Sequence, residues 1–285
     1  MKRWTILLVV LALFLLAGAP QVAAQADSQS YLILARGNSL SGDLAGEVAD
    51  AGGELTRTLP QVGLAVATSS NPDFAAQLER ARGIRSVVSN LNVQWIDPGQ
   101  QVEADFDNPP NSGDDDFFFD LQWGHDAVDA PEAWNTGHFG AGARVAVLDT
   151  GFDTDHPDLA PNINLGLSMD FTGEGLDYTL PDPFSHGTHV AGTIAAADNA
   201  FGTIGVAPQA ELVLVKVLGD AGSGTFADVI SGIVHAADVD ADVINMSLGA
   251  TLLKSGDPDP EEGDPYTARE ANELKNAINR AVSYA

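Results

Sequence analysis

The sequence of 285 residues contains no cysteine and few basic side chains. Without cysteine there is no disulfide scaffold, no cysteine-ligated zinc and no thiol nucleophile. Lysine and arginine number 13 against 40 aspartates and glutamates, which gives a formal net charge of −27. A field this negative repels phosphate backbones, so we expect no nucleic-acid partner.

Long hydrophobic runs are also scarce, and the one present follows Lys2 and Arg3 over residues 4–17. Small residues come next and would allow cleavage after Ala24 or Ala26. The apolar run is shorter than the roughly 20 residues that a membrane-spanning helix needs. We therefore predict that residues 1–26 are a signal peptide, that the mature protein is secreted, and that it has no membrane contact after cleavage.

The whole sequence has the composition of folded domains, with 45% hydrophobic residues. Its charge is uneven: residues 1–96 hold 7 basic and 7 acidic side chains, whereas residues 97–285 hold 6 and 33. The acidic stretch 97–116 is rich in Pro, Gly and Asn, as linkers are. We therefore predict a domain over 27–96, an acidic linker over 97–116 and a larger domain over 117–285.

The first domain is predicted to be a small α/β module. Its apolar runs indicate strands, its amphipathic segments indicate short helices, and the sequence contains no histidine before His125. We therefore expect no catalytic constellation in this module. The predicted strands cover residues 31–35, 62–68, 84–90 and 92–96, and the predicted helices cover 44–53 and 72–82.

The second domain is predicted to be an α/β fold with a doubly wound parallel sheet, because strand and helix patterns alternate along it. The strands are expected at 144–149, 212–218 and 243–248, and the helices at 185–197, 226–239 and 268–284. Catalytic groups in such sheets lie beyond the carboxyl ends of the strands. That rule directs attention to Asp149, to residues 219–224 and to residues 247–249.

An Asp–His pair is the strongest candidate for chemistry. Asp149 ends the first strand of the second domain, and His186 begins a helix after Ser185, a suitable N-cap. A carboxylate beside an imidazole fixes its tautomer and stabilises the imidazolium formed when the ring takes a proton. Taken singly, the two residues could equally be a turn-capping aspartate and a helix-start histidine.

Two other kinds of site use similar residues in α/β proteins. His186 and His189 could bind a metal together with Asp153, Asp155 and His156, which would indicate a metallohydrolase. The H-E-x-x-H spacing is absent, however, and we expect His189 to be a buried, hydrogen-bonded histidine. A dinucleotide site is excluded because no G-x-G-x-x-G follows a strand in the required context.

Four segments in order carry a family resemblance: VAVLDTGFDTDHPDL, HGTHVAGTIAA, GVAPQAELVLVKVLGDAGSG and VINMSLG. They resemble the subtilisin-like serine peptidases (subtilases) over residues 121–249, and residues 30–96 look like the inhibitory propeptide of that family. The resemblance implies a subtilisin-like domain that acts on protein or peptide substrates. It makes Asp149 the triad aspartate and His186 the general base, and it implies a zymogen whose own propeptide is an intramolecular inhibitor.

The resemblance also implies a substrate cleft. Residues 218–224 match the edge strand that pairs with an extended substrate, and a second segment matches the opposite wall and the specificity pocket. The residues expected to bind substrate are Gly222, Ser223, Gly224, Ser247, Leu248 and Gly249.

A structural Ca²⁺ site is implied as well, without any organic cofactor. The expected ligands are the side chains of Asp158 and Asn199, the backbone carbonyls of Ala197, Phe201 and Thr203, and either Asp115 or Gln122. Such oxygen-only ligation suits Ca²⁺, whereas the plain alternative is a solvated acidic loop.

The family's nucleophile lies in a G-T-S-M-A-type turn beyond the NMSLG strand, and no serine after His186 has that context. The asparagine of the oxyanion hole is missing as well. We therefore expect an incomplete subtilisin-like domain, a precursor truncated before the catalytic serine and inactive as given. The alternative is a catalytically inactive, subtilase-derived binding or inhibitor protein in which the N-terminal module is the active part.

Overall fold

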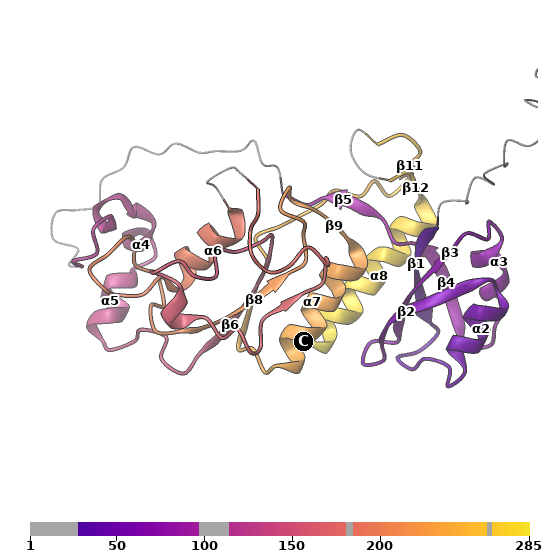
Figure 1. Cartoon of the computed structure of the whole chain (residues 1–285), viewed down its shortest axis with the longest axis horizontal. Helices are drawn as coiled ribbons and strands as arrows, with labels where there is room; N and C mark the ends of the chain where they lie inside the picture. Colours follow the sequence, from indigo (N-terminus) through magenta and orange to yellow (C-terminus); the bar gives the residue numbers. More distant parts are fainter. Residues whose placement is uncertain (1–27, 97–113, 181–184, 261–263) are drawn as a thin grey trace, which may run out of the picture.

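The computed structural model describes residues 28–96, 114–180, 185–260 and 264–285. The predicted signal peptide and most of the predicted linker lie outside these ranges. Within them, no helix is both long enough and apolar enough to cross a membrane. Figure 1 shows the two expected bodies, the N-terminal module and the larger domain, in contact with each other.

The N-terminal module is a four-stranded antiparallel sheet in the order β2-β3-β1-β4. The sequence prediction missed β2, because this edge strand alternates exposed and half-buried residues and has no apolar run. The second helix is shorter than expected, since Asn71 fixes the turn before it by accepting a hydrogen bond from Asp73 N at 3.1 Å. The elements are β1 Gln29–Ala35, α2 Leu44–Asp50, β2 Gly53–Leu59, β3 Leu64–Ser69, α3 Phe74–Leu78 and β4 Ile84–Ser89.

Both faces of the module sheet are buried. One face packs against α2 and α3, with Ile33, Phe74 and Val87 in its core. The other face, with Leu32, Leu34 and Val88, belongs to the same hydrophobic core as the helices of the larger domain. The two bodies therefore share a core, and each buries apolar surface that the other would leave exposed.

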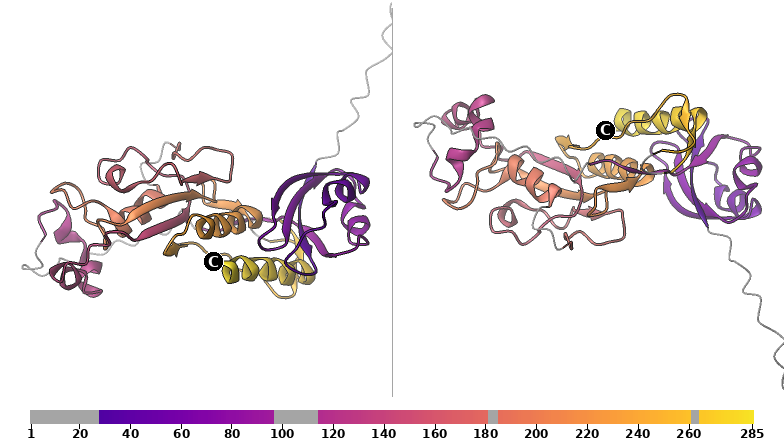
Figure 2. Two further views of the ribbon diagram at one scale, coloured as in Figure 1. Left: turned by 90° about the horizontal axis from the view of Figure 1, so that it is seen from below. Right: turned by 90° about the horizontal axis from the view of Figure 1, so that it is seen from above.

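The larger domain contains a parallel sheet in the order β10-β6-β8-β7, as the alternating pattern predicted. Helix α6 (His186–Ala195) covers one face of the sheet and α7 (Phe226–Asp238) covers the other, so the sheet is doubly wound (Figure 2). Its strands are β6 Arg144–Asp149, β7 Met169–Asp170, β8 Glu211–Lys216 and β10 Val243–Asn245.

Strand β10 is shorter than the predicted 243–248. In the described part of the chain it pairs with β6 alone, and only residues 243–245 are in register. Val243 is 53% exposed and Met246 is 39% exposed. The apolar sequence of this segment is typical of a strand buried on both sides. In the described residues, however, β10 lies at the edge of the sheet and is partly exposed.

The last helix, α8 (Ala268–Tyr284), begins and ends where the sequence predicted. A capping box between Thr267 and Glu270 starts it, and its apolar side packs against α7 and β4. Before it, β11 (Gly256–Asp257) and β12 (Tyr266–Thr267) form a short antiparallel pair. The remaining elements of this domain are η1 Phe119–Leu121, α4 Trp123–Ala127, α5 Ala130–Asn135, η2 Ala160–Asn162 and β9 Ser223–Thr225.

Candidate active site

Asp149 and His186 come together at the carboxyl edge of the parallel sheet. Asp149 is the last residue of β6 and is completely buried, whereas His186 is the first residue of α6 and is half-buried. Ser185 caps α6 as predicted, because its hydroxyl accepts a hydrogen bond from Thr188 N. The strand end and the helix start thus aim the two side chains at each other.

The two side chains share a hydrogen bond, with His186 Nδ1 at 2.8 Å from Asp149 Oδ1. This bond raises the pKa of His186 above its ordinary value, against the opposing effect of burial. A carboxylate on Nδ1 leaves Nε2 as the ring atom that can take a proton from a nucleophile. The geometry of the predicted Asp–His pair is therefore present, while its catalytic role stays a prediction.

Two hydroxyl groups link Asp149 to His186: that of Thr150, which the sequence analysis did not single out, and that of Ser185, which it named only as an N-cap. Thr150 donates both N–H (2.8 Å) and Oγ1–H (3.3 Å) to Asp149 Oδ1, and its Oγ1 accepts from Gly187 N at 3.1 Å. Ser185 Oγ donates to Gly151 O at 2.6 Å. These bonds join the strand end to the first turn of α6, so they fix the distance between the carboxylate and the imidazole. Their signal in the sequence was a hydroxyl residue next to each member of the pair.

An extended strand of the N-terminal module lies along the predicted cleft. Strand β5 (Asn92–Gln94) was expected to belong to the module sheet, but it pairs antiparallel with β9 instead. The register places Val93 opposite Gly224 and Gln94 opposite Ser223, and Trp95 N donates to Gly222 O at 3.0 Å. The predicted edge strand is therefore paired with an extended segment of the same chain.

The opposite wall of the cleft contacts the same segment. Gly249 N donates to Trp95 O at 3.0 Å, so this segment is held between Gly222 and Gly249. Leu248 packs on the shared core, and the exposed Ser247 accepts a hydrogen bond from Asn245 Nδ2. A Cβ built on Gly249 would have no atom within 4 Å, so the space beside this residue is open.

The indole of Trp95 anchors this segment. Its Nε1 donates to Gly224 O at 2.9 Å, and its ring centroid lies 4.9 Å from that of Phe226. The side chain is almost fully buried and lines a hollow of about 320 Å³ with residues of α8 and of the 250–254 loop. The indole of Trp95 thus packs between β9 and α8, and its N–H has a hydrogen-bond partner there.

The predicted Ca²⁺ ligands are only partly brought together. Asp158 accepts from Asn199 Nδ2 (3.1 Å) and from Thr203 N (2.9 Å), so these residues do adjoin one another. Gln122, by contrast, exchanges two hydrogen bonds with the backbone of Ile204. Ala197 N donates to Asp158 O, and the side chain of Phe201 is exposed. These bonds hold Gln122 next to the 199–203 loop, and the choice of Gln122 or Asp115 as the sixth ligand stays a prediction.

A cluster of four aspartates lies on another side of the same loop, and we call it the aspartate cluster: Asp114, Asp115, Asp116 and Asp198. One carboxylate oxygen from each lies within 4.8 Å of the others. Asp116 is 4% exposed; its Oδ1 accepts from Phe201 N at 3.1 Å, and its Oδ2 is buried without a partner among the described residues. Burial, together with the neighbouring Asp114, raises the pKa of Asp116 to about 7. Residues 114–116, assigned to the linker above, therefore belong to the larger domain.

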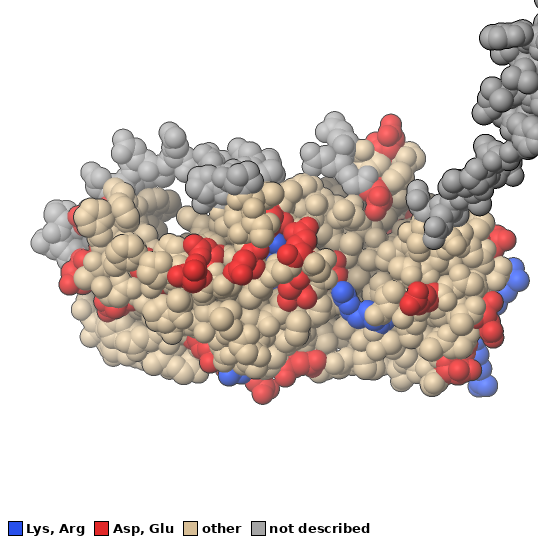
Figure 3. Space-filling model, in the orientation of Figure 1, with Lys and Arg blue, Asp and Glu red and all other residues tan. Residues whose placement is uncertain are grey.

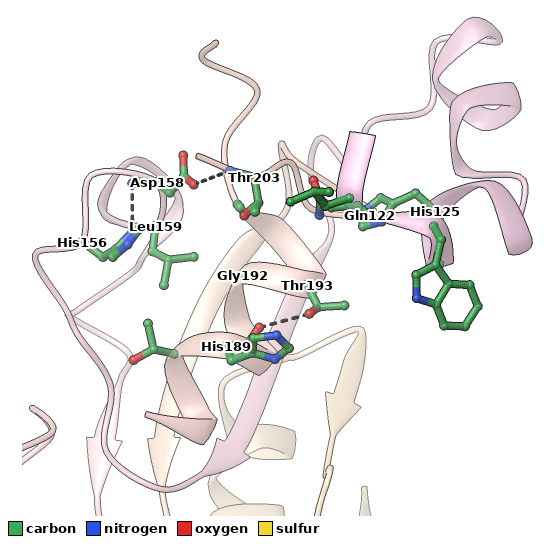
Figure 4. A pocket seen from close by; sticks show the side chains of 14 residues that line it. Gln122, His125, His156, Asp158, Leu159, His189, Gly192, Thr193 and Thr203 are labelled. Atoms are coloured by element: carbon green, nitrogen blue, oxygen red, sulfur yellow. Dashed lines mark hydrogen bonds between the residues drawn. The ribbon is translucent and has the colours of Figure 1, made fainter. Parts of the chain in front are cut away.

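His189 is exposed, so the expectation of a buried histidine was wrong: it lies on the outer side of α6. Figure 4 shows it facing a hollow of about 510 Å³ that is also lined by Gln122, His125 and Asp158. Among the described residues, only the aspartate cluster gathers three or more metal-ligating groups. The alternative metal site with His186, His189 and three neighbours is therefore not assembled, since His186 Nδ1 is bonded to Asp149.

A buried lysine supports the loops beside the site. Lys216 ends β8 opposite Asp149 in the register and is completely buried. Its ammonium forms ion pairs with Asp220 and, at 3.3 Å, with Glu174. Gly151 passes so close that a Cβ there would lie 2.3 Å from Asp220 Oδ1. The ion pair therefore lies directly against the chain that follows Asp149, and the sequence gave no sign of it.

The described part of the chain places no serine hydroxyl in a hydrogen bond with His186 Nε2. Ser231 is buried in α7 and donates to Ala227 O at 2.6 Å, and Ser223 lies in β9. The site therefore contains an imidazole and its carboxylate partner, without a serine beside them among the described residues.

The fold and the site together define an α/β protein with an Asp–His pair of the kind used for general-base chemistry, next to a groove that holds an extended strand. The Subtilase family of serine peptidases matches residues 140–284. The chain belongs to this family.

Known serine proteases are similar in sequence to part of this chain. An intracellular serine protease of Paenibacillus polymyxa is 48% identical over 160 residues, which is 56% of this chain and 44% of that protein. Subtilisin Savinase of Lederbergia lenta is 44% identical over 170 residues, which is 58% of this chain and 61% of that protein. The chain thus spans about half the length of the curated relatives that it matches.

Solved structures agree on the fold. The epidermin leader peptide processing serine protease of Staphylococcus aureus superposes with a TM-score of 0.64 at 20% identity, over 90% of this chain and 58% of that one. Fervidolysin of Fervidobacterium pennivorans gives a TM-score of 0.60 at 24% identity, over 90% and 39% of the two chains. Both superpositions take in nine tenths of the chain, so most of the N-terminal module has a counterpart in each.

Proposed function

We propose that this chain is the N-terminal part of a secreted serine endopeptidase made as an inactive precursor. The observation that supports it most is the hydrogen bond between His186 Nδ1 and Asp149 Oδ1, located beside a groove that holds an extended polypeptide strand. The predicted signal peptide supports secretion. The substrates would be protein segments in extended conformation, bound by their backbone along β9.

In the proposed reaction, His186 is the general base and Asp149 keeps its ring oriented. His186 Nε2 takes the proton of a serine hydroxyl as that oxygen bonds to the scissile carbonyl, and then gives the proton to the leaving amine. Water hydrolyses the acyl-enzyme by the same steps. The serine would come from sequence that residues 1–285 do not contain, so we expect no turnover from these residues alone.

The N-terminal module is proposed to be the inhibitor of the same molecule. Its segment 92–96 occupies the path along β9 that a substrate would need. Arg57 and Asp228 form an ion pair at 2.8 Å, and the shared core holds the two bodies together. Removal of the module would free both walls of the groove.

The aspartate cluster is proposed to hold a structural Ca²⁺ ion. Four carboxylates gather there without a basic partner in the described residues, and Asp116 Oδ2 is buried and unpaired. Hard oxygen ligands of this kind suit Ca²⁺, which would neutralise their repulsion and join residues 114–116 to the 198–203 loop. The reaction needs no organic cofactor.

A chimera tests the catalytic proposal: residues 1–285 followed by the C-terminal part of Subtilisin Savinase, including its nucleophile. We expect peptide hydrolysis after the module is removed, and a fall of about 10⁴-fold in kcat for His186→Ala or Asp149→Asn. His235→Ala, a histidine on α7, is the matched control and should retain activity. An active chimera that tolerates His186→Ala would contradict the proposal.

The second candidate is a catalytically inactive, subtilase-derived binding or inhibitor protein, favoured by the docking of segment 92–96 in the groove. It predicts that residues 1–285 fold stably and cooperatively without any peptidase activity. Inhibition of another subtilase by the N-terminal module is compatible with both candidates. A chimera that folds but never hydrolyses peptide would favour this second one.

A further inference from the structure

The outer edge of β5 meets a residue of the larger domain that the substrate cleft predicted from the sequence did not include. Asn92 N donates to Asp264 Oδ2 at 3.0 Å, and Asp264 N donates to Asn92 O at 3.3 Å. Both hydrogen bonds use the backbone of Asn92, and its side chain takes part in neither. Any residue with a free backbone N–H could therefore be held in the same way.

The pairing of β5 explains why these groups are available. In an antiparallel pair, every second residue turns its N–H and C=O away from the partner strand. Leu91 O accepts from Phe226 N, and Val93 is paired with Gly224, so the residues on both sides of Asn92 face α7 and β9. Asn92 faces the other way, where Asp264 meets it.

Asp264 lies next to residues that are held in place by burial and hydrogen bonds. It lies two residues before Tyr266, which is buried in β12 and accepts a hydrogen bond from Leu253 N at 2.8 Å through its hydroxyl. Thr267 then caps α8. A charged acceptor on such a support makes a stronger hydrogen bond to a backbone N–H than a neutral one.

We propose that Asp264 is a specificity-determining residue that lengthens the substrate groove. Gly249 holds the backbone of the residue at the Trp95 position, and Asp264 holds the backbone three residues upstream, at the Asn92 position. The preferred substrates are extended protein segments with at least five residues along this path, and proline is disfavoured at the Asn92 position because it has no N–H. This inference rests on the proposed endopeptidase function.

Amide hydrogen exchange in the full chain tests the inference, with segment 92–96 as the strand in the groove. We expect Asp264→Ala to speed exchange of the Asn92 amide by about tenfold and to leave the Trp95 amide, which bonds Gly222 O, within twofold. Asp264→Asn keeps an uncharged acceptor and should give a smaller acceleration, also at Asn92 alone. Asn92→Ala should leave the exchange at position 92 unchanged, since only the backbone is held.

Asp259→Asn is the matched control, because it removes the same charge from the same loop and Asp259 has no contact with β5 among the described residues. An unchanged Asn92 amide in Asp264→Ala overturns the inference, as does equal acceleration at Asn92 and Trp95, which would mean general loosening. The measurement needs no turnover. Its failure would therefore leave the roles of Asp149 and His186 intact, and an inactive chimera would leave the exchange result intact.

Discussion

At the scale of single residues, the proposed chemistry depends most on Asp149, a fully buried carboxylate whose Oδ1 accepts three hydrogen bonds, from His186, Thr150 N and Thr150 Oγ1. Its Oδ2 is buried without a partner among the described residues. Burial of a charged carboxylate destabilises the folded state unless hydrogen bonds or an opposite charge compensate it. Here the charge stabilises a protonated His186, which is what general-base catalysis requires.

This arrangement predicts a change in proton affinity. Asp149→Asn removes the charge that holds the pKa of His186 above its usual value, so we expect that pKa to fall. The interaction of protonated His186 with Asp149 contributes stability to the folded state. That contribution is complete below the unfolded-state pKa of His186 and is lost as pH rises through its folded-state pKa. NMR titration of the His186 ring measures both variants. His235, whose Nε2 contacts Leu167 O, is the internal control; an unchanged His186 titration would contradict the prediction.

Among the elements, β5 has the most unexpected position. The sequence assigned residues 92–96 to the module, and the structure pairs them with β9 of the larger domain. Strand pairing depends on which edge lies within reach, and segment 92–94 lies beside β9, with which it pairs antiparallel. The same short segment therefore connects the module to the proposed active site.

Trp95 provides a graded test of that connection. Trp95→Phe removes the indole N–H bond to Gly224 O and should lower the free energy of unfolding by about 1 kcal/mol. Trp95→Ala also empties the site beside Phe226 and should cost about 3–5 kcal/mol. Urea unfolding of the full chain measures both. Equal losses would show that the hydrogen bond, and not the ring, dominates.

Arg57 provides a second test, on β2. Its guanidinium pairs with Asp228 at 2.8 Å, donates to Ser231 Oγ at 3.0 Å and lies 5.3 Å from the ring centroid of Phe171. Arg57→Ala should therefore destabilise the full chain by about 1–2 kcal/mol in urea unfolding. Arg82→Ala changes an exposed arginine of the same module and should have little effect. A similar loss in both variants would refute a specific role for Arg57.

The whole molecule is dominated by negative charge, as the red side chains spread over the face in Figure 3 show. Few basic groups oppose it, and three of them, Arg57, Arg85 and Arg269, pair across the border between the module and the larger domain. The aspartate cluster concentrates this charge at one point. Cation binding should therefore affect the stability of the molecule as a whole.

Calcium should raise the Tm of the full chain, and the increase should grow from pH 5 to pH 8. Burial and Asp114 raise the pKa of Asp116 to about 7, so the folded state without metal binds more protons than the unfolded state between about pH 4 and pH 7. Stability without metal is consequently lost as pH rises through this window, and Ca²⁺ offsets the loss. Thermal unfolding with Ca²⁺ or EDTA measures it.

The variant Asp116→Asn separates this site from the ligands expected from the sequence. It should remove most of the calcium-dependent rise in Tm and the pH dependence of that rise. Asp126→Asn, an aspartate of α4 outside the cluster, is the control and should keep both. A full calcium effect in Asp116→Asn would assign the ion to other ligands.

The sequence alone determined the parallel sheet and the location of the Asp–His pair. Strand β6 and helix α8 lie within the predicted boundaries, because a continuous apolar run and a 3.6-residue period are local patterns. Family motifs placed Asp149 and His186 in hydrogen-bonding position for the same reason: each occupies the end of a local element.

Only the tertiary structure decided the contacts between distant segments. Asp114, Asp116 and Asp198 meet across more than 80 residues, β5 pairs with β9 across about 130, and Asp264 reaches Asn92 across 172. No local pattern encodes such meetings, because they depend on how two complete sheets and their helices pack. The sequence thus determined the long helices, the central strands and the motif residues, whereas the groove, its contact with Asp264 and the aspartate cluster arose from packing.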